Sequence, residues 1–507
     1  MQSKRFGQGL SGRRMRPSQR GRRGFLGMMG GAGAAFVAAA CGGSNNNSGK
    51  AATAIATRAA QATSAPAGVT GGTAAAATRA APSATSSAPV KVSSVSYWSG
   101  DNAPEEVAFH HKMNDDFAAA FPQYKAESSE FSNSAEWYPK LQTALASNTV
   151  PDFLFKDSQG QDVPTLWDQG LLSPLNDVME DVYKLAGGKD NFNKAAVDRY
   201  TLPTGELTAV PYILSSYVFW FRQDLLQEAG LTPPTGHWDF NFLLKAVKAV
   251  HKPPSVYGIA MPISHTNTPQ YNLAPFIFGN GGHLLSADLK DVVFDSPEVR
   301  EAVDLVKELT QYVPPGATSW GSPDQVNAIV TGNCAMGIYL GRVFPNLVNQ
   351  NPSLIGKMSN TLIPYNKEPR TWGGPAPHAL FKASKNPAGA KEFMKFSMRK
   401  ENYISYMLTA PGFYLPLIPA YGTDPSYADN AVLKRFDPKL VATIAEAGKV
   451  GADFQQEGPG WKINPKSATL QGSLFMADMI QKLAIGKEST QSVVTFGVQQ
   501  IRDIMKG

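Results

Sequence analysis

The chain has 507 residues, a formal net charge of +6 and 43% hydrophobic residues, which is enough for about three domain-sized units. The first 91 residues hold 12 of the 47 Lys and Arg residues and no Asp or Glu, so residues 92–507 carry 35 basic against 41 acidic side chains. A nucleic-acid-binding protein concentrates Lys and Arg on its folded surface. The charge distribution therefore excludes general nucleic-acid binding, and the hydrophobic content excludes a chain that is disordered throughout.

Residues 1–41 have the pattern of an export signal. Arg22-Arg23 stands before an uncharged stretch rich in Gly and Ala, and Ala38-Ala39-Ala40 leads directly into Cys41. This resembles a twin-arginine signal that ends in a bacterial lipoprotein cleavage box. The resemblance implies that Cys41 carries lipid and anchors the protein to the outer face of the cell membrane. A plain signal peptide and an uncleaved anchor are the alternatives, although 17 Gly-rich residues make a poor membrane span.

Residues 42–91 form a low-complexity segment dominated by Ala, Ser, Thr, Gly, Asn and Pro, with no aromatic and no acidic residue. Such a composition cannot bury enough apolar surface to offset the entropy of folding. As a flexible coil, a segment of this length spans ~40 Å root-mean-square. We expect a disordered tether that holds a folded body away from a membrane.

The body, from residue 92 on, alternates strand and helix patterns. Residues 92–100 alternate in polarity like a strand, and Pro104 with two following acids predicts a helix that stops at Phe121. Ser296 and Asn386 are expected to cap two later helices. Further elements are expected at residues 138–146 (helix), 152–155 (buried strand) and 163–167 (helix). This alternation predicts α/β layers with mostly parallel sheets.

A series of short motifs along the body resembles the extracellular solute-binding proteins of ABC transporters, family 1, sugar type. Each motif is short, and their order along essentially all of residues 92–507 carries the resemblance. The pair Phe221-Arg222 replaces the family's Tyr-Asn, and Gly341-Arg342-Val343 lacks a Trp often found there. The motifs are Tyr97-Trp98, Phe121-Pro122, Val150-Pro151-Asp152-Phe153, Gly170-Leu171-Leu172-Ser173-Pro174-Leu175, Val210-Pro211-Tyr212, Phe219-Trp220-Phe221-Arg222-Gln223-Asp224-Leu225, Gly332-Asn333-Cys334-Ala335-Met336 and Ala388-Gly389-Ala390-Lys391-Glu392-Phe393.

The resemblance implies an α/β, two-lobed, periplasmic-binding-protein-like fold, in which a ligand cleft between the lobes closes by hinge motion. Lobe one is expected at residues 92–209 and 364–398, and lobe two at residues 210–363 and 399–507. The chain is expected to cross between the lobes near Pro211, Ile363-Pro364 and Arg399.

The body has few of the sequence motifs that are typical of enzymes. It has no Gly-x-Ser-x-Gly elbow, no His-Glu-x-x-His and no complete phosphate loop. His110 and His111 are adjacent on a predicted helix, so they cannot converge on one metal and are interpreted as surface residues. Cys334 lies in an apolar run and is interpreted as a small buried hydrophobe. No catalytic residue, metal ligand or cofactor is predicted.

Candidate ligand-binding residues lie in loops that follow strands and near the expected crossings. A sugar ring has an apolar face and a rim of hydroxyls, so its binding site needs aromatic rings and planar polar groups. The alternatives are that the aromatics cover the core, that the polar residues cap helices, and that Arg342 forms a structural ion pair. The candidates are Trp98, Asn133, Ser134, Asp157, Tyr212, Arg342, Trp372, Gly373 and Tyr414.

Two functions from different classes follow. The first is a monomeric receptor that captures a mono- or oligosaccharide, or a related polyol, and delivers it to the permease subunits of an ABC importer. The second is a membrane-tethered hydrolase of surface polysaccharide. Turnover separates them, because a receptor is stabilised by its ligand and forms no product.

Overall fold

A computed structural model describes residues 92–131, 134–156 and 162–506 of the chain. The expected signal and tether, including Cys41, lie outside these residues, as do the candidate site residues Asn133 and Asp157.

The first lobe is built on a six-stranded sheet with the strand order β2-β1-β3-β8-β4-β9. β1 pairs in parallel with β2 and with β3, whereas β8, β4 and β9 are antiparallel to their neighbours. The expectation of mostly parallel sheets is therefore wrong. The physical reason is that β8, β4 and β9 come from segments that cross between the lobes, and such strands need no helical crossover on the sheet. The strands are β1 (Ser93–Ser99), β2 (Tyr124–Glu130), β3 (Phe153–Phe155), β4 (Val210–Ser216), β8 (Gly373–Leu380) and β9 (Leu415–Pro416).

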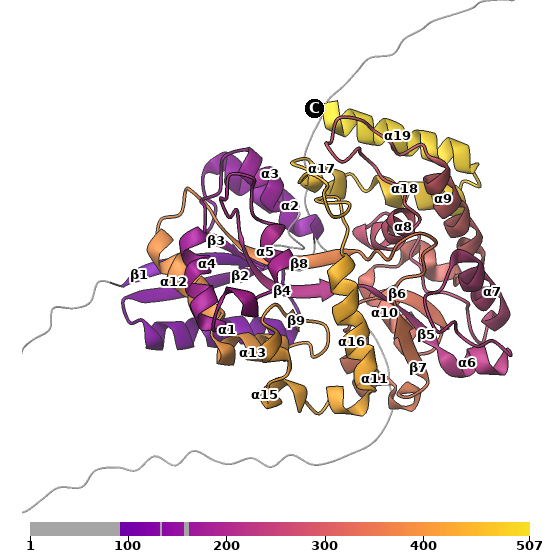
Figure 1. Ribbon diagram of the computed structural model, residues 1–507, viewed down its shortest axis with the longest axis horizontal. Coiled ribbons are helices and arrows are strands. Elements are labelled where there is room, and N and C mark those ends of the chain that lie inside the picture. The colour runs from indigo at the N-terminus through magenta and orange to yellow at the C-terminus, as the bar shows by residue number, and fades with distance from the viewer. Residues whose placement is uncertain (1–91, 132–133, 157–161, 507) are drawn as a thin grey trace, which may run out of the picture. The chain divides into compact units, whose positions relative to one another are not determined.

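Helices cover this sheet in the indigo, magenta and orange half of the molecule (Figure 1). α1 (Pro104–Ala120) turns Glu106, His110, Met113 and Phe117 inward, at the spacing of one helix face. The other helical elements of the first lobe are α2 (Ser134–Ser147), α3 (Asp162–Asp168), α4 (Asn176–Leu185), η2 (Lys189–Asn191), α5 (Lys194–Asp198), α12 (Pro387–Ser397), α13 (Lys400–Met407), α14 (Pro419–Gly422) and α15 (Pro425–Ala428).

The second lobe contains a three-stranded antiparallel sheet with the order β6-β5-β7. Its strands are β5 (Val218–Arg222), β6 (Met336–Tyr339) and β7 (Met358–Thr361). Its helical elements are α6 (Gln223–Glu228), α7 (Phe240–Val250), α8 (Asn267–Gly279), α9 (Pro297–Leu309), η3 (Thr310–Tyr312), η4 (Pro315–Ser319), α10 (Ser322–Val330), α11 (Val343–Gln350), η5 (Pro352–Leu354), η6 (Leu433–Arg435), α16 (Pro438–Ala447), η7 (Gly448–Val450), α17 (Ser467–Gly472), α18 (Phe475–Ala484) and α19 (Thr490–Lys506).

Local sequence signals gave several helix starts correctly. The Ser296 hydroxyl accepts a hydrogen bond from the Val299 backbone at 3.2 Å and caps α9. The Asn386 amide oxygen accepts one from the Gly389 backbone at 3.0 Å and caps α12. Both helices then continue with a Pro in the first turn, where the missing N–H has no intrahelical partner to lose.

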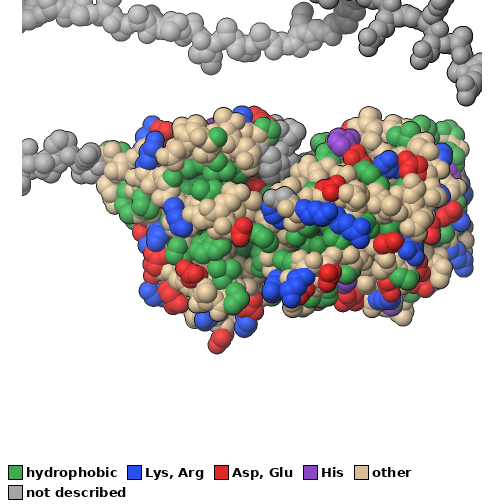
Figure 2. Space-filling view, turned by 90° about the horizontal axis from the view of Figure 1, so that it is seen from above, with side chains coloured by type: hydrophobic (Ala, Val, Ile, Leu, Met, Phe, Trp, Pro, Cys, Tyr) green, Lys and Arg blue, Asp and Glu red, His purple; other side chains and the backbone are tan. Residues whose placement is uncertain are grey.

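The chain passes from one sheet to the other through very short connections. Only Tyr217 separates β4 from β5, and the chain returns between β7 and β8. After Arg399, helices α13, α14 and α15 still lie beside the first sheet, and α16 then packs on strands of both sheets. The described residues belong to one compact unit, so the lobe limits expected from the sequence stay a prediction. In the view from above, Lys and Arg side chains gather near the junction of the two lobes (Figure 2).

The two sheets and their helices share one continuous hydrophobic core. Cys334 is fully buried in it as a free thiol, which confirms its interpretation as a small buried hydrophobe, and burial raises the pKa of the thiol to about 12. None of the helices within the described part of the chain combines the length and apolar character needed to cross a membrane.

Candidate functional site

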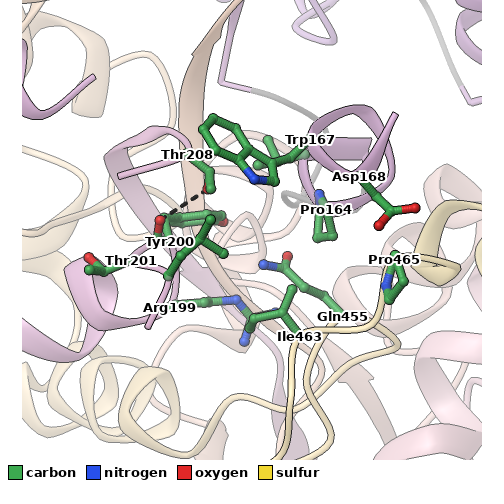
Figure 3. A pocket seen from close by; sticks show the side chains of 12 residues that line it. Pro164, Trp167, Asp168, Arg199, Tyr200, Thr201, Thr208, Gln455, Ile463 and Pro465 are labelled. Carbon is green, nitrogen blue, oxygen red and sulfur yellow. Dashed lines mark hydrogen bonds between the residues drawn. The ribbon is translucent and has the colours of Figure 1, made fainter. Parts of the chain in front are cut away.

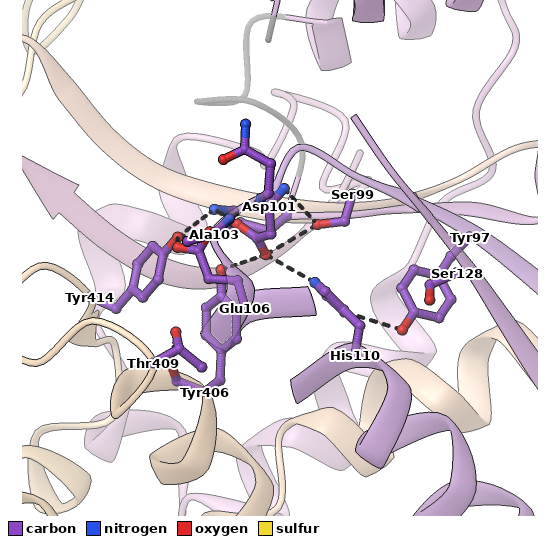
Figure 4. Close-up of polar contacts among 12 residues, drawn as sticks. Tyr97, Ser99, Asp101, Ala103, Glu106, His110, Ser128, Tyr406, Thr409 and Tyr414 are labelled. Atoms are coloured by element: carbon purple, nitrogen blue, oxygen red, sulfur yellow. Dashed lines mark hydrogen bonds and ion pairs between the residues drawn. The ribbon is translucent and has the colours of Figure 1, made fainter. Parts of the chain in front are cut away.

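A polar cluster joins the two lobes through the ion pair of Glu106 with Arg342, and Figure 4 shows its members Asp101, Glu106 and Tyr414. We define it by Asp101, Glu106, Lys156, Arg342 and Tyr414, which come from four separate parts of the chain. Lys156 directly follows β3, and Asp101 lies two residues after the end of β1; the carboxyl ends of these parallel strands meet at one edge of the sheet. Glu106 lies in the first turn of α1, Arg342 precedes α11, and Tyr414 precedes β9.

Asp101 is the most enclosed carboxylate of the polar cluster, with 1% of its surface exposed. Its Oδ2 accepts hydrogen bonds from the Tyr406 hydroxyl at 2.9 Å and the Ser99 hydroxyl at 3.1 Å, and lies 3.1 Å from His110 Nε2. Its Oδ1 forms an ion pair with the Lys156 ammonium. Burial alone would raise the pKa of Asp101, but the charge of Lys156 and the hydrogen bond from His110 hold it well below its ordinary value.

Glu106 connects the first lobe to the second. Its Oε2 accepts hydrogen bonds from the backbone N–H groups of Asn102 and Ala103, at 3.2 Å and 3.0 Å, so it closes the first turn of α1. Its Oε1 accepts a hydrogen bond from the Arg342 guanidinium at 2.5 Å. Since Arg342 follows β6 of the second lobe, this ion pair bridges the lobes.

Tyr414 stands between the two carboxylates. Its hydroxyl lies 2.7 Å from Glu106 Oε1 and 3.1 Å from Asp101 Oδ1, and it accepts a hydrogen bond from Lys156 Nζ at 2.9 Å. Its ring stacks on that of Tyr406 at 4.6 Å. Burial raises the pKa of both tyrosines well above the ordinary value, so both hydroxyls keep their protons.

His110 is a correction to the sequence interpretation. His111 is exposed as expected, but His110 is fully buried, between Asp101 and the Tyr97 hydroxyl, which lies 3.1 Å from His110 Nδ1. Adjacent helical residues differ in direction by a quarter turn or more, so only one of the pair faces the sheet.

The two carboxylates of the polar cluster are balanced by Lys156 and Arg342. The cluster thus has no net charge, and each charged group in it has a partner. Within the cluster, the ion pair of Glu106 with Arg342 joins the elements of the two sheets.

Comparison with known families agrees with this two-lobed arrangement. A family model described as bacterial extracellular solute-binding protein matches residues 100–404, more than half of the chain. The chain belongs to this family. The family and the fold predicted from the sequence are thus confirmed.

The solute-binding protein is similar to a putative ABC transporter periplasmic-binding protein of Escherichia coli (strain K12), with 22% identity over 308 residues that cover 59% of this chain and 67% of that protein. A similar solved structure is a solute-binding protein of Thermotoga lettingae bound to α-D-tagatose, with a TM-score of 0.64, 20% identity and coverage of 81% and 99% of the two chains. An Arthrobacter chlorophenolicus sugar transporter protein with bound laminaribiose has a TM-score of 0.67, 19% identity and coverage of 81% and 99%. An Agrobacterium radiobacter solute-binding protein in complex with ribitol has a TM-score of 0.67, 18% identity and coverage of 82% and 100%.

Two of the residues predicted from the sequence, Arg342 and Tyr414, meet on Glu106 in the polar cluster. The expected alternative for Arg342, an ion pair, is present. Ser134 begins α2. The ligand contacts predicted for these residues stay a prediction.

The other predicted aromatic residues, Trp98, Tyr212 and Trp372, lie outside the polar cluster of the solute-binding protein. Trp98 is partly buried, with its ring 4.9 Å from Phe131 in an edge-on arrangement. Tyr212 is fully buried 4.3 Å from the ring of His378, and its hydroxyl has no hydrogen-bond partner among the described residues. Trp372 is also fully buried and stacks on Tyr271 at 5.0 Å. Neither Tyr212 nor Trp372 presents a ring face to solvent in this conformation, and their ligand role stays a prediction.

Gly373 begins β8 with a φ of 109°, a conformation that favours glycine. A Cβ at this position would lie 2.6 Å from the Ser215 carbonyl oxygen. The close pairing of β4 and β8 thus requires glycine here, whether or not a ligand also approaches it.

Sequence reasoning missed Asp101, Glu106 and Lys156. Two signals were available, because Asp101 and Lys156 each directly follow a predicted strand, the place where α/β proteins put their binding residues. Glu106, at the third position of α1, is predicted from the sequence only as a helix-start acid. No neighbouring residue in the sequence indicates that its second carboxylate oxygen contacts the other lobe.

Proposed function

We propose that this solute-binding protein is the receptor of an ABC importer, which captures a neutral carbohydrate or polyol between its lobes and delivers it to the permease. The observation that carries the proposal is the polar cluster, in which Glu106 of the first lobe and Arg342 of the second are joined beside the crossing strands. A ligand held at such a place couples its own binding to lobe closure.

The charge balance of the polar cluster supports a neutral ligand. Two carboxylates and two cations already neutralise one another, and an added net charge would need a new partner in a buried place. Hydroxyl groups can instead exchange hydrogen bonds with these side chains. The proteins of similar fold from T. lettingae, A. chlorophenolicus and A. radiobacter are bound to tagatose, laminaribiose and ribitol, which are all uncharged polyhydroxy compounds.

Isothermal titration calorimetry tests the proposal with the wild-type chain and a panel of D-tagatose, ribitol, maltose and laminaribiose. We expect saturable one-to-one binding of at least one compound, with a matching rise in melting temperature and no product on chromatography after prolonged incubation. Product formation from any panel member would assign the protein to the hydrolase class instead. Binding of none would remove the carbohydrate assignment.

We further propose that the protein is extracytoplasmic and held at the outer face of the cell membrane by lipid on Cys41. The support is the Arg22-Arg23 pair and the small residues before Cys41. Cys41→Ala should move the protein from the membrane fraction to the soluble fraction of the producing cells. Mass spectrometry that finds an unmodified Cys41 within an intact chain would contradict this.

A further inference from the structure

A second place where the lobes meet is a cavity of about 150 Å³ beside α3, which we call the α3 pocket (Figure 3). Its lining comes from α3, from the segment between α5 and β4, and from the segment between η7 and α17. None of its residues belongs to the polar cluster or to the candidates predicted from the sequence. The lining residues are Val163, Pro164, Trp167, Asp168, Arg199, Tyr200, Thr201, Leu202, Thr208, Gln455, Ile463 and Pro465.

The α3 pocket contains polar groups without partners. Gln455 has 1% of its surface exposed, yet neither Oε1 nor Nε2 of its side chain has a hydrogen-bond partner among the described residues. The same holds for Nε of Arg199, whose terminal nitrogen pairs with Asp453 at 2.5 Å. Buried polar groups are nearly always hydrogen-bonded, so each exception needs an explanation.

The side of the α3 pocket that lies across from Gln455 is apolar. Figure 3 shows the indole of Trp167 on one side of the space and the Gln455 side chain on the other, with Pro164 between them. Trp167 is partly exposed, so its ring remains available for contact. A cavity near 150 Å³ is large enough for one six-membered ring.

These features together match one class of ligand. A sugar ring places an apolar face on an indole and directs hydroxyls, each both donor and acceptor, to the oxygen and nitrogen of an amide. The Asp453 carboxylate neutralises Arg199, so the unpaired groups at the buried end call for hydroxyls rather than for an anion. We propose that the α3 pocket is a subsite for one sugar ring, held between Trp167 and Gln455.

The inference rests on the proposed function, because it assumes that the ligand is a carbohydrate. It goes beyond that function by assigning specific ligand contacts to α3 in the first lobe and to the η7–α17 segment in the second. A ring in the α3 pocket contacts both lobes at once, so it also favours their closed arrangement.

Calorimetry of two matched variants tests the proposal with whichever of maltose, laminaribiose, D-tagatose and ribitol binds the wild-type chain. Gln455→Leu removes the unpartnered amide, whereas Gln456→Leu is the control, because the Gln456 amide donates to the Trp461 carbonyl and lies outside the pocket lining. We expect Gln455→Leu and Trp167→Ala each to weaken binding by about 5- to 150-fold, and Gln456→Leu to change it by less than about 3-fold. A crystal structure of the complex should place a ring between Trp167 and Gln455.

Wild-type affinity in both Gln455→Leu and Trp167→Ala, or a complex with the α3 pocket empty, would overturn this inference and leave the proposed function standing. Failure of every compound to bind the wild-type chain would overturn the proposed function, and this inference with it. A loss of affinity in Gln456→Leu equal to that in Gln455→Leu would also overturn it, because the effect would then belong to the whole segment.

Discussion

The polar cluster and the α3 pocket both lie between the lobes, but they treat buried polar groups in opposite ways. Every charged group of the polar cluster has a partner, and Asp101, for example, accepts hydrogen bonds from Tyr406 and Tyr414 and contacts His110 and Lys156. In the α3 pocket, Gln455 is equally buried, and its side-chain amide has no hydrogen-bond partner within the described residues. The difference teaches that burial alone does not identify a binding group. A satisfied group stabilises the unliganded fold and binds a ligand only by exchanging a partner, whereas an unsatisfied group gains a partner when a ligand binds.

Loss of the central carboxylate should be the largest effect. Asp101→Ala leaves Lys156 and several buried donors without their acceptor, and breaking a buried pair on one side costs about 3–5 kcal/mol. Urea denaturation should show this fall in the free energy of unfolding. Asp116→Ala is the control on the same helix as Glu106, because its ion pair with Lys112 is exposed and should change the value by less than about 0.5 kcal/mol. Equal effects in the two variants would show that the polar cluster does not stabilise the fold.

Removal of the bridging cation should have a smaller effect. Arg342→Ala leaves Glu106 with its two backbone donors and Tyr414, so we expect a loss of about 1–3 kcal/mol. Because this ion pair joins the lobes, small-angle X-ray scattering should also show a larger radius of gyration. Arg300→Ala is the matched control, since Arg300 pairs with Asp295 on the surface of the second lobe. An unchanged radius of gyration in Arg342→Ala would show that this ion pair does not hold the lobes together.

A substitution in the α3 pocket should change stability in the opposite direction, because it should raise the free energy of unfolding. Gln455→Leu removes an unpartnered buried amide and should raise the free energy of unfolding of the unliganded protein by about 1 kcal/mol. Differential scanning calorimetry without sugar should therefore give a higher melting temperature than wild type, whereas Gln456→Leu should not. A clear loss of stability in Gln455→Leu would show that its amide is structural, like the groups of the polar cluster.

The acid dependence of stability should be the smallest effect and is confined to low pH. The pKa of Asp101 is held below its ordinary value, so the unfolded chain takes up this proton at a higher pH than the native protein does. The stabilisation is complete above the ordinary value near ~3.9 and is lost as pH falls towards the lower folded value. The difference in unfolding free energy between wild type and Asp101→Asn should thus be constant above about pH 5 and shrink below about pH 4. A difference that grew on acidification would contradict the assigned direction.

Much of the fold was accessible from the sequence, because its signals are local. The cap at Ser296, the Pro-Glu-Glu start of α1 and the alternation along β1 each depend on a few neighbouring residues. The antiparallel course of β8 and β4 was not accessible, because strand order is decided by pairings between residues more than 150 positions apart, such as Val210 with His378.

The candidate site was accessible only in part. Arg342 and Tyr414 were found from their places near the expected crossings, but their common partner Glu106 was interpreted as a helix-start acid. The α3 pocket was not found at all. Gln455 lies in an irregular segment, and the property that marks it, an amide without a partner, exists only once the surrounding chain is folded.

The rate at which the buried thiol of Cys334 is labelled by a thiol reagent measures how often the second lobe opens around it. A thiol that is fully buried and has a pKa of about 12 cannot react with a thiol reagent until its surroundings open and release it to solvent. The rate of chemical labelling then counts opening events, and its dependence on urea separates local fluctuation from global unfolding. Cys334 is the free cysteine within the described residues, and the second cysteine of the chain, Cys41, is removed by Cys41→Ala so that only Cys334 is labelled. The effect of a ligand on the opening around Cys334 can therefore be measured at a native side chain, with no engineered labelling site.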